Sequence, residues 1–435
     1  MPPCEPAWDL FPGRAFFVRR LLGFLLACLP ATTGGAWTLT PALSLTHYAL
    51  AQSHPFFGEA QRHWLETSLA LGGKLRRGPF TAALTGMAIS TTGTDPYGTV
   101  ADAPALAVDE AYIQWQGQGR TPWTLTLGRQ PIELGTQFLI GDGISDGYGP
   151  RAQQGVYHNP RRGFDALRLQ ADLRPFHLDA LYYRVDPTWD GGGGRDGRFG
   201  GLELSRHSGR LRGDYAAGLF YRYSHSDLDN DMALLDLRAE QPLPRLAGLS
   251  FGGEYVRELG TGWNAAYVTT PGQSLAEAAW HAELSYQDSL SGLQPFAEMG
   301  YVYYSQDFTP VATGFPDWGK WFLGNQIDWI VFGSDCRIAH AQLGCWPHSS
   351  VKVRGQYFHT RLIEGRGALS DEFSLIGEWY PREGCWINLL VGYARPGSGL
   401  AQAGLSNPFA ALNPDALPVG GRASLDWIFA CGVSF

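Results

Sequence analysis

The last fourteen residues of the chain, 422–435, alternate between apolar and polar side chains. Leu425, Trp427 and Phe429 belong to an apolar parity, and the other parity is mostly polar, with Ile428 as its main exception. Because successive side chains of a strand point to opposite faces, this segment predicts a strand with one apolar face. A soluble strand rarely runs so long, whereas a barrel strand in lipid needs an apolar outer face and a polar inner face. The segment therefore predicts a membrane-spanning strand.

The same alternation recurs along the whole chain and divides it into eighteen strands, with sixteen as the alternative number. An even number is what bacterial single-chain barrels require. The first strand is the weakest, because Pro41 interrupts it. The predicted strands are 38–50, 62–71, 79–90, 105–116, 123–134, 163–173, 175–185, 199–207, 211–224, 232–240, 247–257, 276–288, 292–304, 323–334, 349–359, 371–380, 384–394 and 422–435.

The connections between these strands alternate in length. Counting back from a C-terminus on the periplasmic side, the outer connections include 135–162 and 395–421, and the inner ones include the short 381–383. Long outer and short inner connections are typical of outer-membrane barrels, and only 335–348 departs from this rule. The sequence therefore predicts an all-β fold, a closed antiparallel transmembrane β-barrel formed by one domain, residues 37–435.

Residues 1–36 have the features of a secretory signal peptide. Arg14, Arg19 and Arg20 precede a short apolar run, and small residues follow it at a place suited to cleavage. An alternative is lipidation of Cys28, which ends a Leu-Leu-Ala-Cys sequence. We therefore expect an exported protein.

The composition agrees with an outer-membrane barrel. Charged residues make up 17% of the chain and aromatic residues 13%, with 56 glycines, whereas soluble proteins carry about 25% charged residues. Beyond the N-terminus, no apolar run is long enough to cross a bilayer as a helix. The net charge of −8 and the absence of a basic run argue against nucleic acid as a partner. We expect the bacterial outer membrane as the location.

Three blocks within residues 108–169 carry a resemblance to a known family. They read Val-Asp-Glu-Ala-Tyr-Ile at 108–113, Leu-Gly-Arg-Gln at 127–130 and Phe-Asp-Ala-Leu-Arg-Leu at 164–169. Together they are similar to the alginate-export family of bacterial outer-membrane β-barrel proteins. The rest of the chain matches that family only as a barrel of suitable size and strand number.

This resemblance implies a porin-like channel that exports an exopolysaccharide, alginate-like or another secreted glycan, through an arginine-containing lumen. Its implied partners are the polysaccharide substrate, the outer-membrane lipid and a periplasmic scaffold lipoprotein of a synthase-dependent secretion complex. Guanidinium groups suit such a conduit, because they bind carboxylates bidentately and hydrogen-bond hydroxyls. The resemblance supplies Arg129, Arg161, Arg162, Asp165 and Arg168 as conduit or constriction residues, and strand parity adds Arg222, Lys352 and Arg354.

Two features of the sequence complicate an arginine-lined conduit. Arg129 shares its parity with the apolar Leu125 and Leu127, so either Gly128 marks a bulge or Arg129 lies at a strand end. Strand parity also places many carboxylates on the polar face, so the arginines either select a polyanion or pair with acids and brace the wall. The carboxylates are Glu110, Asp172, Glu277, Glu283, Glu298, Glu372, Glu378 and Asp426.

The same architecture supports a second function equally well, a general or substrate-specific diffusion porin that imports small solutes. A third class, an outer-membrane hydrolase, requires a Ser/His/Asp set grouped at one rim, and the sequence shows none. We therefore expect no enzyme and no cofactor.

The remaining chemistry-bearing residues are cysteines and aspartates. Oxidised cysteines are permitted outside the cytoplasm, and the spacing allows two pairs, Cys336 with Cys345 and Cys385 with Cys431, with free apolar cysteines as the alternative. The histidines and cysteines show no metal-binding spacing. A weak calcium candidate consists of Asp227, Asp229 and Asp231, for which a solvated loop tip is the plainer explanation.

Overall fold

The computed structural model describes residues 36–53, 61–94, 100–141, 164–184, 198–208, 213–223, 232–244, 246–262, 273–288, 290–306, 308, 324, 335–363, 367–400 and 422–435. Residues 1–35 of the predicted signal peptide, which include Cys28, lie outside these residues. Among the residues described, no helix has the length and apolar character needed to cross a membrane.

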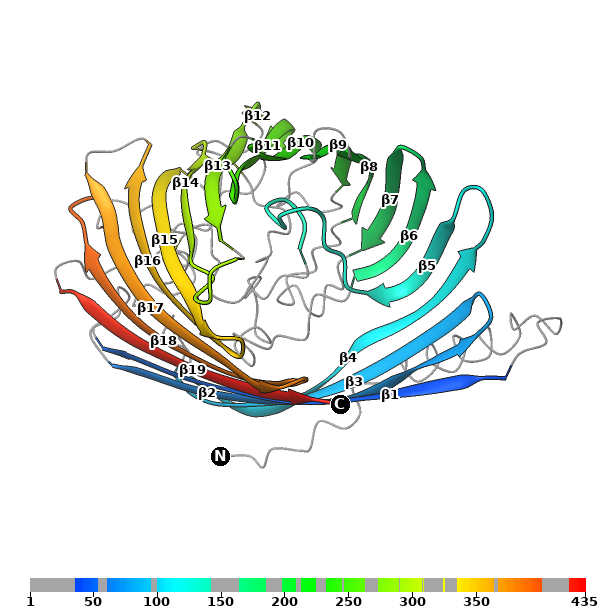
Figure 1. Ribbon diagram of the computed structural model, residues 1–435, viewed down its shortest axis with the longest axis horizontal. Helices are drawn as coiled ribbons and strands as arrows, with labels where there is room; N and C mark the ends of the chain where they lie inside the picture. Colours follow the sequence, from blue (N-terminus) through cyan, green and yellow to red (C-terminus); the bar gives the residue numbers. More distant parts are fainter. Residues whose placement is uncertain are drawn as a thin grey trace, which may run out of the picture.

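The strands form a single closed antiparallel barrel (Figure 1). Strand β1 pairs with β2 on one side and with β19 on the other, which closes the ring. Strands β12 and β13 both pair with β11 and occupy successive parts of one position, so the barrel has eighteen strand positions, as predicted.

The strands are β1 (Thr38–Ser53), β2 (Arg62–Arg77), β3 (Phe80–Thr94), β4 (Val100–Gly117), β5 (Trp123–Gln130), β6 (Phe164–Leu173), β7 (Phe176–Arg184), β8 (Arg198–Ser208), β9 (Gly213–Tyr223), β10 (Met232–Pro242), β11 (Leu249–Gly262), β12 (Gln273–Leu275), β13 (Ala278–Gln287), β14 (Phe296–Tyr304), β15 (Cys336–His348), β16 (Val351–Leu362), β17 (Ala368–Arg382), β18 (Cys385–Pro396) and β19 (Ser424–Ser434).

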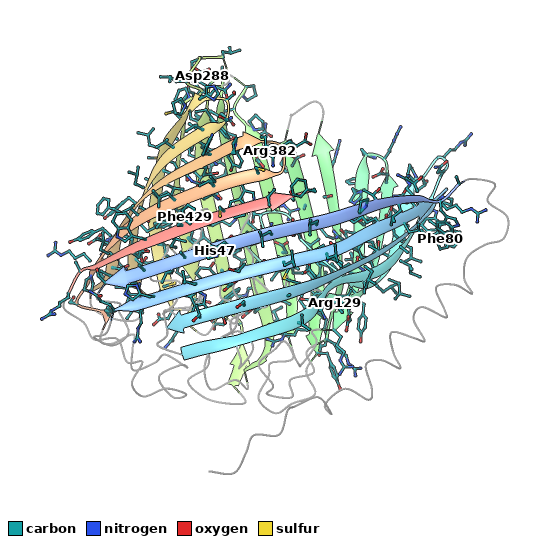
Figure 2. All side chains as sticks on the ribbon, turned by 90° about the horizontal axis from the view of Figure 1, so that it is seen from below. His47, Phe80, Arg129, Asp288, Arg382 and Phe429 are labelled. Atoms are coloured by element: carbon teal, nitrogen blue, oxygen red, sulfur yellow. The ribbon has the colours of Figure 1, made fainter. Side chains whose placement is uncertain are left out.

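Alternation along each strand separates a lipid-facing wall from a lumenal wall. In β19, Leu425, Trp427 and Phe429 are exposed on the outer surface, whereas Asp426 and Ile428 are buried inside. Figure 2 shows Phe429 near the middle of this strand. A protein that spans a bilayer as strands needs an apolar outer surface in contact with lipid. It also needs a closed barrel, because closure gives every backbone N–H and C=O group a hydrogen-bond partner on a neighbouring strand. The fold is therefore that of an outer-membrane protein.

The apolar Ile428, which departs from the polar inner parity of β19, belongs to a cluster on the lumenal wall. The cluster joins strands β1, β2, β17, β18 and β19, and its members are at most 6% exposed. Ile428 therefore fits the inner face because its neighbours there are apolar. The cluster consists of Tyr48, Leu50, Trp64, Ile376, Leu390, Ile428 and Ala430.

One strand was predicted in the wrong place. Except for Gly324, the predicted strand 323–334 lies outside the described residues, and the barrel position after β14 is filled by β15, Cys336–His348. The outer face of β15 carries Arg337, Ala339 and Ala341, so its apolar signal is weak. With β15 in place, 335–348 is no longer a long inner connection, and the inner connection at this point is the two-residue turn 349–350.

The two proposed disulfides are wrong, because none of these four cysteines forms a disulfide. Cys336 and Cys345 lie nine residues apart on the same strand, β15, which separates them by about 30 Å at the usual rise. Cys385 stands opposite Val433 rather than Cys431. The actual register of the last hairpin is displaced by two residues from the predicted one, so the second pair does not meet.

A charge placed on the lipid-facing wall tests this assignment of faces. Phe429→Arg puts a guanidinium at mid-strand on β19, and we expect it to destabilise the barrel by ~2–4 kcal/mol in lipid. Leu425→Arg, the matched control at the outer end of the same strand, should cost ~0–1 kcal/mol. Urea unfolding in liposomes measures both. Equal effects at the two positions would contradict the placement of β19 across the membrane.

Candidate functional site

The chain that follows β5 turns into the barrel instead of continuing the wall. Strand β5 ends at Gln130, and the next residues fold into the enclosed space (Figure 1). The amide of Leu134 donates to the carbonyl of Ile140 at 3.0 Å, and the amide of Gln137 donates to the carbonyl of Leu134 at 2.9 Å. Gly135 and Gln137 have φ of 54° and 66°, which a tight turn requires. We call residues 131–141 the inward segment.

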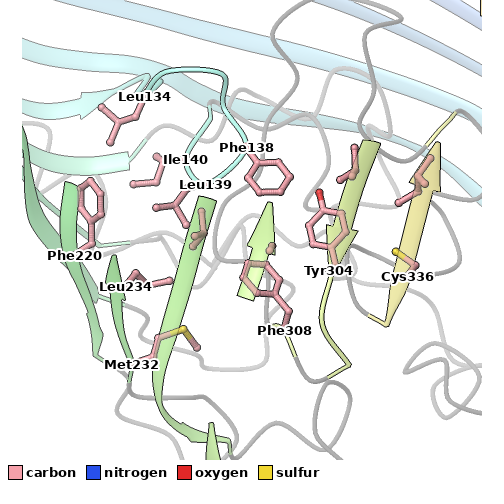
Figure 3. Packing of buried hydrophobic residues seen from close by; sticks show 14 of the residues in the cluster. Leu134, Phe138, Leu139, Ile140, Phe220, Met232, Leu234, Tyr304, Phe308 and Cys336 are labelled. Atoms are coloured by element: carbon pink, nitrogen blue, oxygen red, sulfur yellow. The ribbon is translucent and has the colours of Figure 1, made fainter. Parts of the chain in front are cut away.

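Apolar side chains hold the inward segment against the far wall. Phe138 stacks on Tyr304 of β14 with ring centroids 5.3 Å apart, and it packs in a T-shaped arrangement with His281 of β13, with ring centroids 4.9 Å apart. Figure 3 shows Phe138 beside Tyr304, and it shows Leu139 and Ile140 on the side of the cluster where Phe220 and Leu234 lie. Fully burying one such side chain contributes about 1.5–3 kcal/mol. The segment is therefore fixed across the lumen by packing.

Polar contacts fix the tip of the inward segment. Thr136 Oγ1 donates to Glu254 Oε2 of β11 at 2.5 Å and lies 3.3 Å from His281 Nε2. A Cβ added at Gly135 would collide with the guanidinium of Arg238 on β10. Both the side chains and the backbone of the turn therefore fit closely to the lumenal residues of β10, β11 and β13.

These wall residues belong to an arc of charged side chains that runs from β6 to β11. Asp179 accepts hydrogen bonds from Arg168 Nε at 3.0 Å and Nη2 at 2.6 Å. Glu203 Oε1 accepts from Arg238 Nη2 at 3.1 Å. Glu254 stands opposite Arg238 in the ladder between β10 and β11.

Asp236, buried on the same lumenal face of β10, completes this charged arc. The arc is Arg168, Asp179, Glu203, Asp236, Arg238 and Glu254. Its four carboxylates outnumber its two guanidinium groups, so it carries net negative charge wherever the carboxylates are ionised.

The opposite wall holds a second group of paired charges. Arg354 Nη2 lies 2.8 Å from Glu378 Oε1, and Lys352 Nζ lies 3.3 Å from the same oxygen. Gln356 Nε2 donates to Gln342 Oε1 at 2.9 Å beside them. Both cations on this wall are therefore engaged by a buried carboxylate, as the wall-bracing alternative predicts.

Arg129 lies at the end of β5. The ladders to β4 and β6 run through Gly128 without a shift and place Arg129 opposite Ala111 and Asp165. The sequence offered two explanations for the parity of Arg129, a bulge at Gly128 or a position at the end of a strand. The second is correct. The register shift lies one ladder away, between β3 and β4.

The other predicted conduit residues divide between the two walls. Asp165 shares its face with the exposed Leu167 and Leu169, so it belongs to the outer surface. Arg168 and Arg222 face the lumen, and Arg168 is bound to Asp179. Arg161 and Arg162 lie outside the described residues. The part of the chain that the structure describes therefore does not assemble an arginine ring from these positions.

The carboxylates predicted for the lumen are largely confirmed as lumenal. Glu372, Glu378 and Asp426 are buried there. Asp172, in contrast, lies at the periplasmic end, where it is 54% exposed and bonds His177 at 2.8 Å. The calcium candidates at 227, 229 and 231 lie outside the described residues, and the part of the chain that is described contains no cluster of three or more metal-ligating side chains.

Comparisons with known proteins place the fold. The sequence matches no protein-family model and no curated protein. The structure is similar to OccAB1 of Acinetobacter baumannii (TM-score 0.61, 11% identity, 91% of this chain and 96% of that one). It is also similar to the outer membrane protein OprD of Pseudomonas aeruginosa (0.53, 12%, 93% and 96%) and to OpdK of the same organism, solved with vanillate (0.55, 11%, 91% and 98%).

These neighbours correct the family suggested by the sequence blocks. The resemblance to alginate-export proteins is wrong, since the structural neighbours are barrels of the OprD and Occ type, a different family of the same strand number. The exopolysaccharide-export function that depended on it is wrong as well. The blocks at 127–130 and 164–169 form the paired ends of β5 and β6, an arrangement that fits many barrels.

Proposed function

We propose that this protein is a diffusion channel that admits small solutes across the outer membrane, with a lumen that favours cations. The observation that carries the proposal is the inward segment, which crosses the barrel and is fixed to the far wall by Phe138 and Thr136. A barrel of this size encloses an aqueous channel. A packed segment inside it narrows the passage to the scale of small molecules.

The fold comparisons support a channel for small solutes. The neighbours match this chain over nearly its whole length, and one of them, OpdK, was solved with the small molecule vanillate. Vanillate is a carboxylate, whereas the charged arc here has excess carboxylates and both of its arginines are already bonded to them. We therefore propose a preference for cationic over anionic solutes, because the field of fixed charges sets local ion concentration.

Solute entry into liposomes tests the channel function. Liposomes that contain the purified protein should swell in isosmotic solutions of small sugars and amino acids, at rates that fall steeply with solute size. Protein-free liposomes and liposomes with heat-denatured protein are the controls. Rates no higher than these controls for every small solute would refute the channel.

Single-channel reversal potentials test the charge preference through Asp236, which belongs to the arc and is 2% exposed. In recordings at pH 9, where the carboxylate of Asp236 is ionised, Asp236→Asn removes one negative charge and leaves the side-chain shape nearly unchanged. At about 10 Å a unit charge alters an ion's energy by ~0.4 kcal/mol in water, with opposite sign for cations and anions. After screening, we expect the cation-to-anion permeability ratio to fall roughly two- to fourfold.

Asp288→Asn is the matched control for this measurement. Asp288 lies in the turn after β13, where its Oδ1 accepts from the amide of Leu290 at 2.8 Å, and asparagine preserves that acceptor. The control should leave the permeability ratio unchanged. A wild-type channel that prefers anions would refute the cation preference while leaving the channel function intact.

A further inference from the structure

Three arginines stand on the lipid-facing wall at the outer ends of β15, β16 and β18, within four neighbouring strands. Arg337 of β15 is opposite Arg361 of β16, and Arg395 of β18 is opposite Asp371 of β17. All three arginines are exposed, and each alternates with buried residues that face the lumen. The strand register therefore gathers positive charge on one part of the outer surface.

The single carboxylate in this group is already engaged by its neighbours. Asp371 Oδ1 accepts from the hydroxyl of Tyr357 and from His359 Nδ1, each at 2.7 Å. Arg395 interacts electrostatically with the same carboxylate. Three guanidinium groups thus face one carboxylate, and the patch keeps net positive charge for a ligand.

An apolar groove lies directly below the arginines. Tyr357, Phe373 and Tyr393 form a row across β16, β17 and β18, two residues toward the membrane centre from His359, Asp371 and Arg395. The groove has a volume of about 570 Å³, and its floor includes Gly355, where an added Cβ would meet open space. Aromatic residues mark the edge of the apolar band in barrels, so the arginines lie at the level of the outer-leaflet headgroups.

We propose that this surface binds a phosphorylated glycolipid of the outer leaflet, with phosphates on Arg337, Arg361 and Arg395 and an acyl chain in the groove below. Arginine forks bind phosphate oxygens through paired, charge-assisted hydrogen bonds. Basic clusters beside an apolar surface are the usual sites for anionic lipid headgroups. The combination of cationic row, aromatic row and groove matches a lipid with a phosphorylated head and long chains.

A second copy of the chain is a less suitable occupant of this surface. A two-fold contact presents the same patch from both subunits, which would bring two rows of arginines together. Like charges at an apolar interface repel, whereas a phosphorylated lipid supplies the opposite charge. Charge complementarity therefore favours the lipid.

Binding of synthetic diphosphoryl lipid A to the full chain in nanodiscs tests the proposal, with native mass spectrometry to count retained lipids. Replacing Arg337, Arg361 and Arg395 by Gln should weaken binding roughly tenfold to a hundredfold. The matched control replaces Arg184, Arg198 and Arg257 by Gln, which stand on the outer face of β7, β8 and β11. Equal loss in both variants, or loss in neither, would overturn the site.

A second variant separates the lipid from free phosphate. Gly355→Leu fills the groove and leaves every arginine in place, so it should weaken binding of lipid A but not of inorganic pyrophosphate. Pyrophosphate that competes fully with lipid A would show an anion site without lipid recognition and would overturn the proposal. Dimers in detergent that the arginine variant dissociates would identify the surface as a subunit interface instead. None of these changes alters the lumen, so conductance should stay at the wild-type value throughout.

Discussion

Replacement of residues 132–140 by a short glycine–serine linker should raise the single-channel conductance roughly two- to threefold, because a barrel of this size without an inward segment encloses an open aqueous channel. The replaced residues include Phe138, which contacts both Tyr304 and His281 across the lumen. Planar-bilayer recordings in symmetrical salt measure the change directly. The barrel itself should stay folded, because the ladders on both sides of β5 end at or before Gln130.

Thr136→Val is the matched point variant for this experiment. It keeps the volume of the segment and its apolar contacts but removes the hydroxyl that donates to Glu254. We expect a mean conductance close to wild type, with more frequent brief transitions as the tip loosens. If the linker variant conducts no better than wild type, the inward segment does not limit the passage, and the proposed constriction is wrong.

The fold was predictable wherever the outer wall is made of large apolar residues. In β19, Leu425, Trp427 and Phe429 are separated by lumenal positions, and the alternation alone gives the strand and its faces. In the first half of β15 the outer positions, Arg337, Ala339 and Ala341, are small or charged, and the lumenal positions include Ile338. The alternation therefore does not show which face of this segment points to lipid, and the strand is identified only by its pairing with β14 and β16.

The inward segment was not predicted, because it shows the same apolar–polar alternation that identified the strands. Ile132, Glu133 and Leu134 alternate as in a strand, although in the opposite parity to Leu125 and Leu127, and the sequence predicted one strand over 123–134. In the structure Ile132 and Leu134 are buried in the lumen against distant strands. Pro131 and Gly135 were the available turn signals, but nothing local shows that a loop packs inside a barrel rather than outside it.

The charged arc depends on pairings that a single strand cannot show. Asp179 and Arg168 lie on different strands and meet diagonally, because Arg168 stands opposite Leu181 in the ladder. Parity correctly predicted that arginines and acids share the inner wall. It did not predict which of them form ion pairs. It also did not single out Glu203, whose partner is Arg238 of β10, or Glu254, whose partner is Thr136 of the inward segment.

The bidentate pair in this arc makes Asp179→Asn the substitution with the largest expected cost in stability, ~3–5 kcal/mol. Asp179 is 3% exposed and accepts from both Arg168 and Gln170. Asparagine leaves the guanidinium of Arg168 without a charged partner in a site where its side chain is only 15% exposed. Urea unfolding in liposomes, followed by the loss of the heat-modifiable gel band, measures the free energy of unfolding.

Asp172→Asn supplies the control, because Asp172 lies on the adjacent strand β6 and is paired with His177 at the exposed periplasmic end. Exposed ion pairs contribute at most about 1 kcal/mol, so this variant should unfold close to wild type. Asp179→Glu tests the geometry further, since it keeps the charge but displaces the carboxylate by one methylene, and its stability should fall between the two. If Asp179→Asn and Asp172→Asn unfold alike, the lumen around Arg168 is as well solvated as bulk water, and the arc acts on passing ions without holding the wall together.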